Sequence, residues 1–167
     1  MRKCIQKWER KRAMALLARV SNALNNMSFD GLATDEYQMA HGFLGEGAYN
    51  AVYALSADLV LRVEKKPGGD SAGWRAFTLA QMYPHENLPV IWEIGVGGDG
   101  RRWAIVERLD IQYADLPGVS GMELVPPELT SAAVSHMKQH DVDLTDNHGY
   151  NLMRRRKSDV WVIADPM

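Results

Sequence analysis

The chain is organised around the segment Leu44-Gly45-Glu46-Gly47-Ala48-Tyr49-Asn50-Ala51-Val52-Tyr53. Its two glycines, one residue apart, allow a tight turn, and the residues on either side favour extended strands. Because glycine has no Cβ, the backbone N–H groups of such a turn can approach a phosphate chain closely. An ordinary hairpin has the same signature, so the turn alone predicts two strands and leaves a nucleotide site as an alternative.

The composition indicates a globular chain with its own core. Its 167 residues suit one domain or two small lobes that share a cleft, and 46% of them are hydrophobic. No apolar run approaches the length that spans a bilayer, and the basic N-terminus leads into an amphipathic stretch instead of an apolar signal core. We therefore expect a cytoplasmic protein without a membrane partner. A single cysteine, Cys4, permits neither an internal disulfide nor a cysteine-based metal cluster.

Charge is distributed unevenly along the chain. The first twenty residues carry a net charge of +6 and the remainder −8, for a total of −2. Apolar residues from Ile5 to Met27 recur at helical spacing, which predicts a helix over about residues 4–26 with one face on the body of the protein. Its basic face could contact an acidic partner, although such faces are usually only solvated. Interleaving of basic and aromatic residues is too weak to support nucleic-acid binding strongly.

Five strands and one helix are predicted after this leader. The strands cover residues 39–45, 50–55, 59–63, 88–95 and 102–107, and the helix covers residues 71–82, before Pro84. Arg62 is a cation in the middle of the third, otherwise apolar strand. If Arg62 is buried, it needs a carboxylate or a ligand phosphate as partner. The alternative is an edge strand from which Arg62 points to water.

After Arg108 the pattern lapses, and Pro117, Gly118 and Gly121 predict a linker into a second lobe. Pro126-Pro127 precede a predicted helix over residues 128–140. His136 and His140 lie one turn apart on this helix. Because no acidic ligand motif accompanies them, we interpret them as surface or capping residues and not as metal ligands.

A polar loop, residues 141–153, then leads into a predicted hairpin that holds Asn151 at its entrance and Asp165 at its exit. The two side chains can therefore converge, and their oxygens suit Mg²⁺, which takes its other ligands from water and nucleotide phosphates. Asp146, five residues before Asn151, is placed to accept a proton. Each residue alone could be turn punctuation. Their order after the glycine turn and Arg62 matches the groups that phosphoryl transfer requires.

With these features the chain resembles the protein kinase superfamily from about Phe43 onward, and most of all the small early-gene Ser/Thr protein kinases of short-tailed bacteriophages. The resemblance implies an α+β fold with a five-stranded antiparallel N-lobe sheet, one helper helix, a reduced and mostly helical C-lobe, and an extra N-terminal helix. The implied regions are residues 1–30 for the basic amphipathic helix, residues 31–109 for the N-lobe, and residues 110–167 for a truncated C-lobe with the catalytic loop and metal-binding hairpin.

The resemblance also implies roles for individual residues. Asp146 matches the catalytic aspartate, Asn151 and Asp165 match the metal ligands, and Arg62 occupies the position of the third-strand lysine. The segment Asp165-Pro166-Met167 stands where the family has its DFG triplet. The implied ATP-binding residues are Gly45, Gly47, Asn50, Val52, Arg62, Glu107 and Leu109. Val52 would cover the adenine, and the last two belong to the implied hinge.

Two further segments carry the resemblance. His85-Glu86-Asn87-Leu88 resembles the turn that follows the helper helix. His148, two residues after Asp146, is also similar to the aminoglycoside and choline phosphotransferases, so a small-molecule phosphotransferase is an alternative. The large insertions that build acceptor pockets in those enzymes are missing here.

The chain also departs from the family pattern. Arg62 replaces lysine, the helix at residues 71–82 has no glutamate, and Leu144-Thr145 replaces the His-Arg pair before the catalytic aspartate. The sequence ends at Met167, before an activation segment, so recognition of a peptide substrate would come from elsewhere.

The resemblance implies a minimal ATP- and Mg²⁺-dependent Ser/Thr kinase that acts on host proteins in the host cytoplasm. The departures favour an alternative, a catalytically impaired pseudokinase that binds nucleotide or a host protein as an inhibitor or interaction module. The sequence does not determine the oligomeric state.

Overall fold

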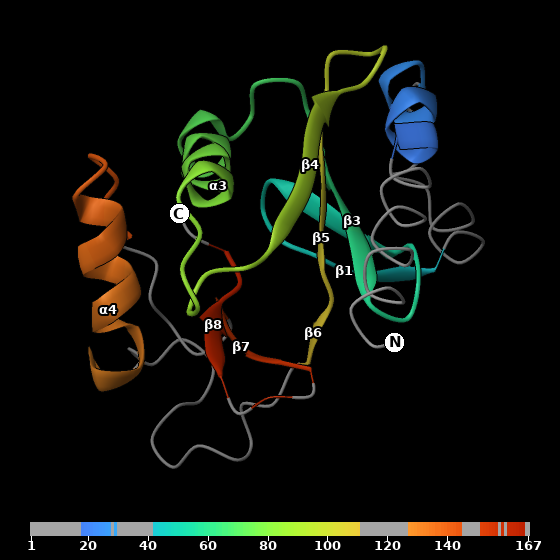
Figure 1. The fold of residues 1–167 in the computed structure, drawn as a ribbon. Helices are drawn as coiled ribbons and strands as arrows, with labels where there is room; N and C mark the ends of the chain where they lie inside the picture. Colours follow the sequence, from blue (N-terminus) through green and yellow to red (C-terminus); the bar gives the residue numbers. More distant parts are fainter. Residues whose placement is uncertain are drawn as a thin grey trace, which may run out of the picture.

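The computed structural model of the chain describes residues 18–27, 29, 42–110, 127–144, 151–156, 158 and 160–165. It has an α+β fold built on a five-stranded antiparallel sheet (Figure 1). The sheet contains β1 (Phe43–Glu46), β2 (Asn50–Ala54), β3 (Leu59–Glu64), β4 (Ile91–Val96) and β5 (Arg102–Glu107), in the order β1-β2-β3-β5-β4. The helix α3 (Ser71–Met82) connects β3 to β4. The predicted five strands and connecting helix are therefore confirmed.

Strand β3 contributes side chains to two hydrophobic cores, one on each face of the sheet, because successive side chains of a strand point to opposite faces. On one face, Val60 packs with Trp74 and Phe77 of α3. On the other face, Leu61 and Val63 pack in a second core. A buried run of apolar residues is the expected pattern for a strand that is covered on both sides.

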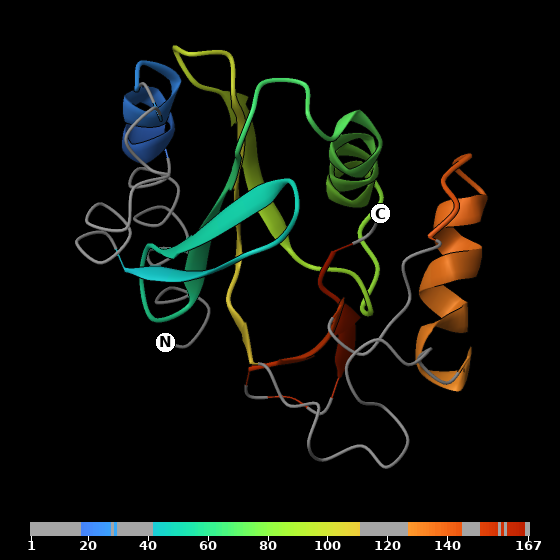
Figure 2. The ribbon, with the colours of Figure 1, turned by 180° about the vertical axis from the view of Figure 1, so that it is seen from behind.

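A helix at residues 18–25 covers the face of the sheet opposite α3 (Figures 1 and 2). Leu24 and Phe29 are buried in the core on that side. The backbone N–H of Phe29 donates to Asp99 Oδ2 at 2.6 Å, and Gly98 N–H donates to the Met27 carbonyl at 2.9 Å. The predicted N-terminal packing helix is thus confirmed for residues 18–25, whereas residues 4–17 lie outside the described part of the chain.

Gly95 of β4 makes this packing possible. A Cβ added to Gly95 would lie 2.3 Å from Cζ2 of Trp103, a ring with 0% exposure. We therefore expect Gly95→Ala to lower the free energy of unfolding by about 2 kcal/mol, because neither the ring nor the sheet can move aside. Urea denaturation measures this change. Gly98→Ala is the matched control, since its Cβ would be 3.5 Å from the nearest atom; equal effects of both variants would contradict the explanation.

A second sheet follows, in the order β6-β7-β8. It contains β6 (Leu109–Asp110), β7 (Leu152–Arg155) and β8 (Trp161–Ile163), and the helix α4 (Pro127–Lys138) packs beside β8 (Figure 1). The predicted hairpin is confirmed, but Arg154 and Arg155 belong to β7 and not to its turn. Strand β6 was not predicted, because two residues show no periodicity. Pro117, Gly118 and Gly121, which predict the linker, lie outside the described residues.

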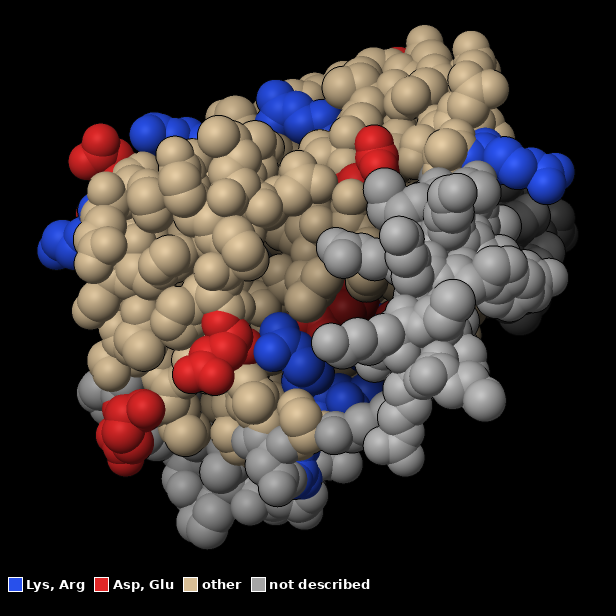
Figure 3. Space-filling view, in the orientation of Figure 1, with Lys and Arg blue, Asp and Glu red and all other residues tan. Residues whose placement is uncertain are grey.

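On the face of the molecule seen in Figure 1, uncharged side chains cover most of the upper part, and basic and acidic side chains lie next to one another below its centre (Figure 3). The edge strand β4 exposes two large apolar side chains, Trp92 and Val96. Within the described residues, no helix combines the length and the apolar character needed to cross a bilayer.

Candidate functional site

Arg62 lies in the interior of the sheet. Strand β3 runs between β2 and β5, with Arg62 opposite Val52 and Ala104, so the alternative of an edge strand is wrong. Arg62 is only 8% exposed, and its Nη2 donates to Asp165 Oδ1 at 2.7 Å, across 103 residues of sequence. The anion that accompanies the buried cation is therefore a carboxylate of the hairpin.

The aromatic ring of Phe77 in α3 provides a second favourable contact for this cation. The Cζ atom of Arg62 lies 4.5 Å from the centre of the ring, in the range of a cation–π interaction. Helix α3 has no acidic residue, so its contact with the Arg62 guanidinium is made by an aromatic ring. In the described part of the chain, Arg62 Nε is buried and makes no hydrogen bond. Beside the Arg62–Asp165 pair there is thus a buried donor without a hydrogen-bond partner among the described residues.

The hairpin brings the two predicted metal ligands to the same end. Leu152 of β7 pairs with Ile163 of β8. Beyond this pair, the N–H of Ala164 donates to the carbonyl of Asn151 at 2.7 Å. Asn151 and Asp165 thereby flank one end of the hairpin, as predicted. Their amide and carboxylate groups supply the hard oxygens that Mg²⁺ prefers. Asp146, the predicted catalytic aspartate, lies outside the described residues, as does His148.

This donor set is small. Among the described residues, no three His, Cys, Asp or Glu side chains are grouped so that they could hold a metal ion. Mg²⁺ typically retains water and binds protein through few carboxylates, so a site for it does not require such a group.

The glycine turn connects β1 and β2 and is closed by a hydrogen bond of 2.9 Å from Gly47 N–H to the Asn50 carbonyl. Neither Gly45 nor Gly47 has a positive φ. A Cβ added to either glycine would meet no atom within 4 Å. Neither a positive φ nor crowding by the described residues therefore requires glycine at these two positions.

Asn50, predicted to bind the nucleotide, is buried and links the turn to α3. Its Nδ2 donates to Asp70 Oδ2 at 3.3 Å, while Asp70 Oδ1 accepts from Gly73 N–H at 2.9 Å and so caps the helix. Glu64, at 0% exposure, accepts from the backbone N–H groups of Asp70 at 3.3 Å and Arg102 at 3.1 Å. The sequence reasoning missed this buried network, although an Asp directly before a predicted helix is a recognisable capping signal.

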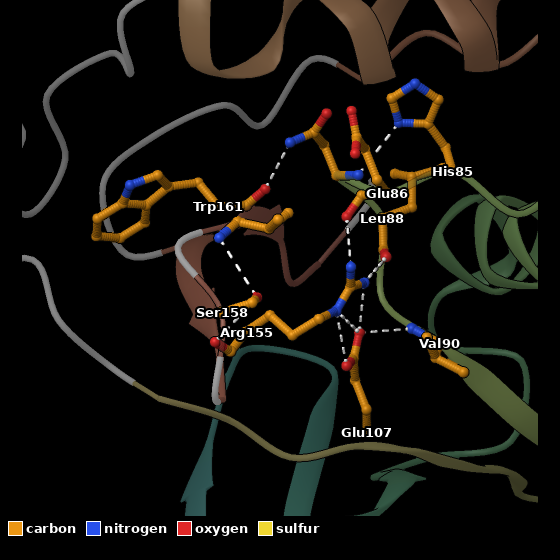
Figure 4. A network of polar contacts seen from close by, with 10 residues as sticks. His85, Glu86, Leu88, Val90, Glu107, Arg155, Ser158 and Trp161 are labelled. Atoms are coloured by element: carbon orange, nitrogen blue, oxygen red, sulfur yellow. Dashed lines mark hydrogen bonds and ion pairs between the residues drawn. The ribbon is translucent and has the colours of Figure 1, made fainter.

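The predicted hinge residues Glu107 and Leu109 lie where the two sheets meet. Arg155 donates to the Glu107 carboxylate through Nε at 3.0 Å and through Nη2 at 2.8 Å (Figure 4). It also donates to the carbonyls of Glu86 at 2.9 Å and Leu88 at 3.0 Å. Arg155 therefore clamps β7 to the end of β5 and to the turn before β4. Leu109 pairs with Arg155 across β6 and β7.

The structure thus brings part of the predicted set together. Val52 and Arg62 are opposite one another on the face that packs against α3, and Asp165 joins them there. The side-chain carboxylate of Glu107 is bonded to Arg155. A scan against protein-family models finds no match, and a search of curated proteins also finds none.

Proposed function

We propose that this protein is a minimal ATP-dependent Ser/Thr protein kinase whose substrates are host proteins. The observation that carries the proposal is the 2.7 Å ion pair between Arg62 and Asp165. It joins the residue expected to hold phosphate to a residue expected to hold Mg²⁺, and it places both beneath the five-stranded sheet. Neither the sequence of β3, which contains Arg62, nor the segment after β8, which contains Asp165, requires this ion pair by itself.

The proposed roles follow from the chemistry of each group. The turn with Gly45 and Gly47 leaves space for a phosphate chain, and Arg62 offers its buried Nε to a phosphate oxygen. Asn151 and Asp165 would hold Mg²⁺, which when bound neutralises phosphate charge. Asp146 would orient the acceptor hydroxyl and accept its proton as the hydroxyl oxygen bonds to the γ-phosphorus and the bond from that phosphorus to the leaving ADP breaks.

A pseudokinase that binds nucleotide without transferring phosphate is the second candidate. The same ion pair favours it, because Asp165 already has a cationic partner that Mg²⁺ would have to displace or share. Arginine is also bulkier than lysine and cannot lose its charge. The two candidates therefore differ in whether Asp165 is free to serve a bound nucleotide.

Transfer of labelled γ-phosphate from ATP with Mg²⁺, measured with and without bacterial lysate, tests the proposal. We expect transfer by the unaltered chain, at least a hundredfold less with Asp146→Ala and with Asp165→Ala, and unchanged transfer with Asp143→Ala, an exposed aspartate of the same loop. No transfer, combined with protection against heating by nucleotide, would instead support the pseudokinase. A chain that neither transfers phosphate nor is protected by nucleotide contradicts both candidates.

A further inference from the structure

The turn between α3 and β4 holds β8 in place. The Asn87 carbonyl accepts from Ile163 N–H at 3.0 Å, and Asn87 Nδ2 donates to the Trp161 carbonyl at 2.8 Å. Asn87 thus satisfies alternate backbone groups of β8, as a neighbouring strand would. Asp165 follows Ile163 by two residues, so this attachment also restrains the carboxylate that pairs with Arg62.

The conformation of this turn depends on the imidazole of His85. Asn87 N–H donates to His85 Nδ1 at 3.2 Å. A backbone N–H can only donate, so Nδ1 must carry a lone pair and the proton of the neutral ring is on Nε2. Protonation of His85 would place a hydrogen on Nδ1. The Nδ1–H and the Asn87 N–H would then both be donors and could not bond to one another.

Other titratable groups surround His85. The ring of His136, from α4, lies 5.0 Å away, and His140 lies 5.4 Å beyond it, stacked on Tyr83 at 3.7 Å. His136 Nε2 donates to the Tyr83 carbonyl at 2.9 Å, so His136 of α4 and His140 in the turn after it both contact Tyr83 at the end of α3 and are not simply solvated. On the side of the turn, Glu86 is the neighbouring acid (Figure 4). The guanidinium of Arg155 bonds to the Glu86 carbonyl.

These surroundings favour the neutral imidazole. Burial lowers the pKa of His85 below its usual value of 6.5, and the nearby His136 lowers it further, against a smaller raising effect of Glu86. A histidine whose pKa is lower in the folded state contributes stability that is complete above the unfolded pKa and is lost as the pH falls below it. The hydrogen bond from Asn87 is therefore expected to weaken in mildly acidic solution.

We propose that His85 is a pH-sensitive positioning residue: its neutral imidazole holds Asn87 against β8, and its protonation loosens β8 and the Asp165 that follows. Only the consequence for phosphate transfer rests on the proposed kinase function. The loosening of β8 follows from the hydrogen bonds themselves and is measurable without nucleotide.

Amide hydrogen exchange of Ile163 tests the inference on the full chain, with the intrinsic exchange rate divided out at each pH. Between about pH 7.5 and about pH 5 we expect its protection factor to fall about five- to tenfold, the change that loss of one hydrogen bond produces. In His85→Asn the Oδ1 atom can replace Nδ1 as acceptor and does not titrate, so the protection should stay high across this range.

His140→Phe is the matched control. It removes a titratable ring but keeps an aromatic ring to stack on Tyr83, so its pH profile should follow that of the unaltered chain. A flat profile in the unaltered chain overturns the inference and needs no variant to be interpreted. An equal decline in His85→Asn overturns it as well.

The exchange experiment and the phosphate-transfer experiment separate the two proposals. A pH-dependent Ile163 amide in a chain that transfers no phosphate supports the positioning role of His85 and contradicts the kinase function. If the chain transfers phosphate but the protection of the Ile163 amide does not change with pH, the kinase function is supported and the positioning role of His85 is contradicted.

Discussion

Asp165→Asn is expected to lower the free energy of unfolding by about 2–3 kcal/mol, because it leaves the Arg62 guanidinium buried without its anion. The side chain of Arg62 is 9% exposed and that of Asp165 is 22% exposed. The partial exposure of Asp165 places the expected cost at the lower end of the range for buried ion pairs. Urea denaturation measures the change, with the same dependence of the unfolding free energy on urea concentration (the m value) used for both proteins.

A double-mutant cycle identifies the origin of this cost. Replacing both partners, as Arg62→Met with Asp165→Asn, should be less destabilising than Asp165→Asn alone, because methionine needs no anion and can still pack on Phe77. Asp143→Asn, at an exposed aspartate, is the control and should change stability by less than about 0.5 kcal/mol. If the double variant is less stable than Asp165→Asn, the buried cation is not the source of the loss.

Arg155→Lys is expected to cost about 3 kcal/mol, although it keeps the positive charge. The guanidinium bonds at once to the Glu107 carboxylate and to the carbonyls of Glu86 and Leu88 (Figure 4). A lysine ammonium can neither make the paired bonds to Glu107 nor reach all three groups. Because the side chains of Arg155 and Glu107 are 22% and 15% exposed, water replaces the lost bonds poorly.

Thermal and urea denaturation measure this effect, with Arg75→Lys on the exposed side of α3 as the control. Combining Arg155→Lys with Glu107→Gln should cost less than the sum of the two single changes, since both remove the same interaction. A loss of less than about 1 kcal/mol for Arg155→Lys would show that the two sheets are held together by other contacts.

Local patterns in the sequence predicted most of the secondary structure. Helix α3 has the predicted bounds, Ser71–Met82, and β5 has the predicted bounds, Arg102–Glu107. Both elements have a dense local signal, from apolar periodicity and from flanking turn residues. The predicted strand at residues 88–95 begins later, at Ile91, because Val90 N–H donates to the Glu107 side chain instead of to a neighbouring strand.

The role of Arg155 could not be predicted in the same way. Residues 154–156 are all arginine, and such a run of charge predicts a solvated turn. The partner of Arg155, Glu107, is 48 residues away in the sequence. No local pattern identifies such a pair, because its energy depends on burial at the junction of two sheets. The same holds for Asn50, whose amide is bonded to Asp70.

By itself, the sequence determined the order of most of the strands and helices along the chain, all but the two-residue β6, and the candidate residues at their ends, because backbone propensity and apolar periodicity act over a few residues. For Arg62 it left two alternatives, an exposed edge strand or a buried cation with an anion. Only the tertiary structure decided between them, by placing β3 inside the sheet and Asp165 at 2.7 Å. The stability of a buried charge depends on which opposite charge the folded chain brings within reach, and here that charge is 103 residues away.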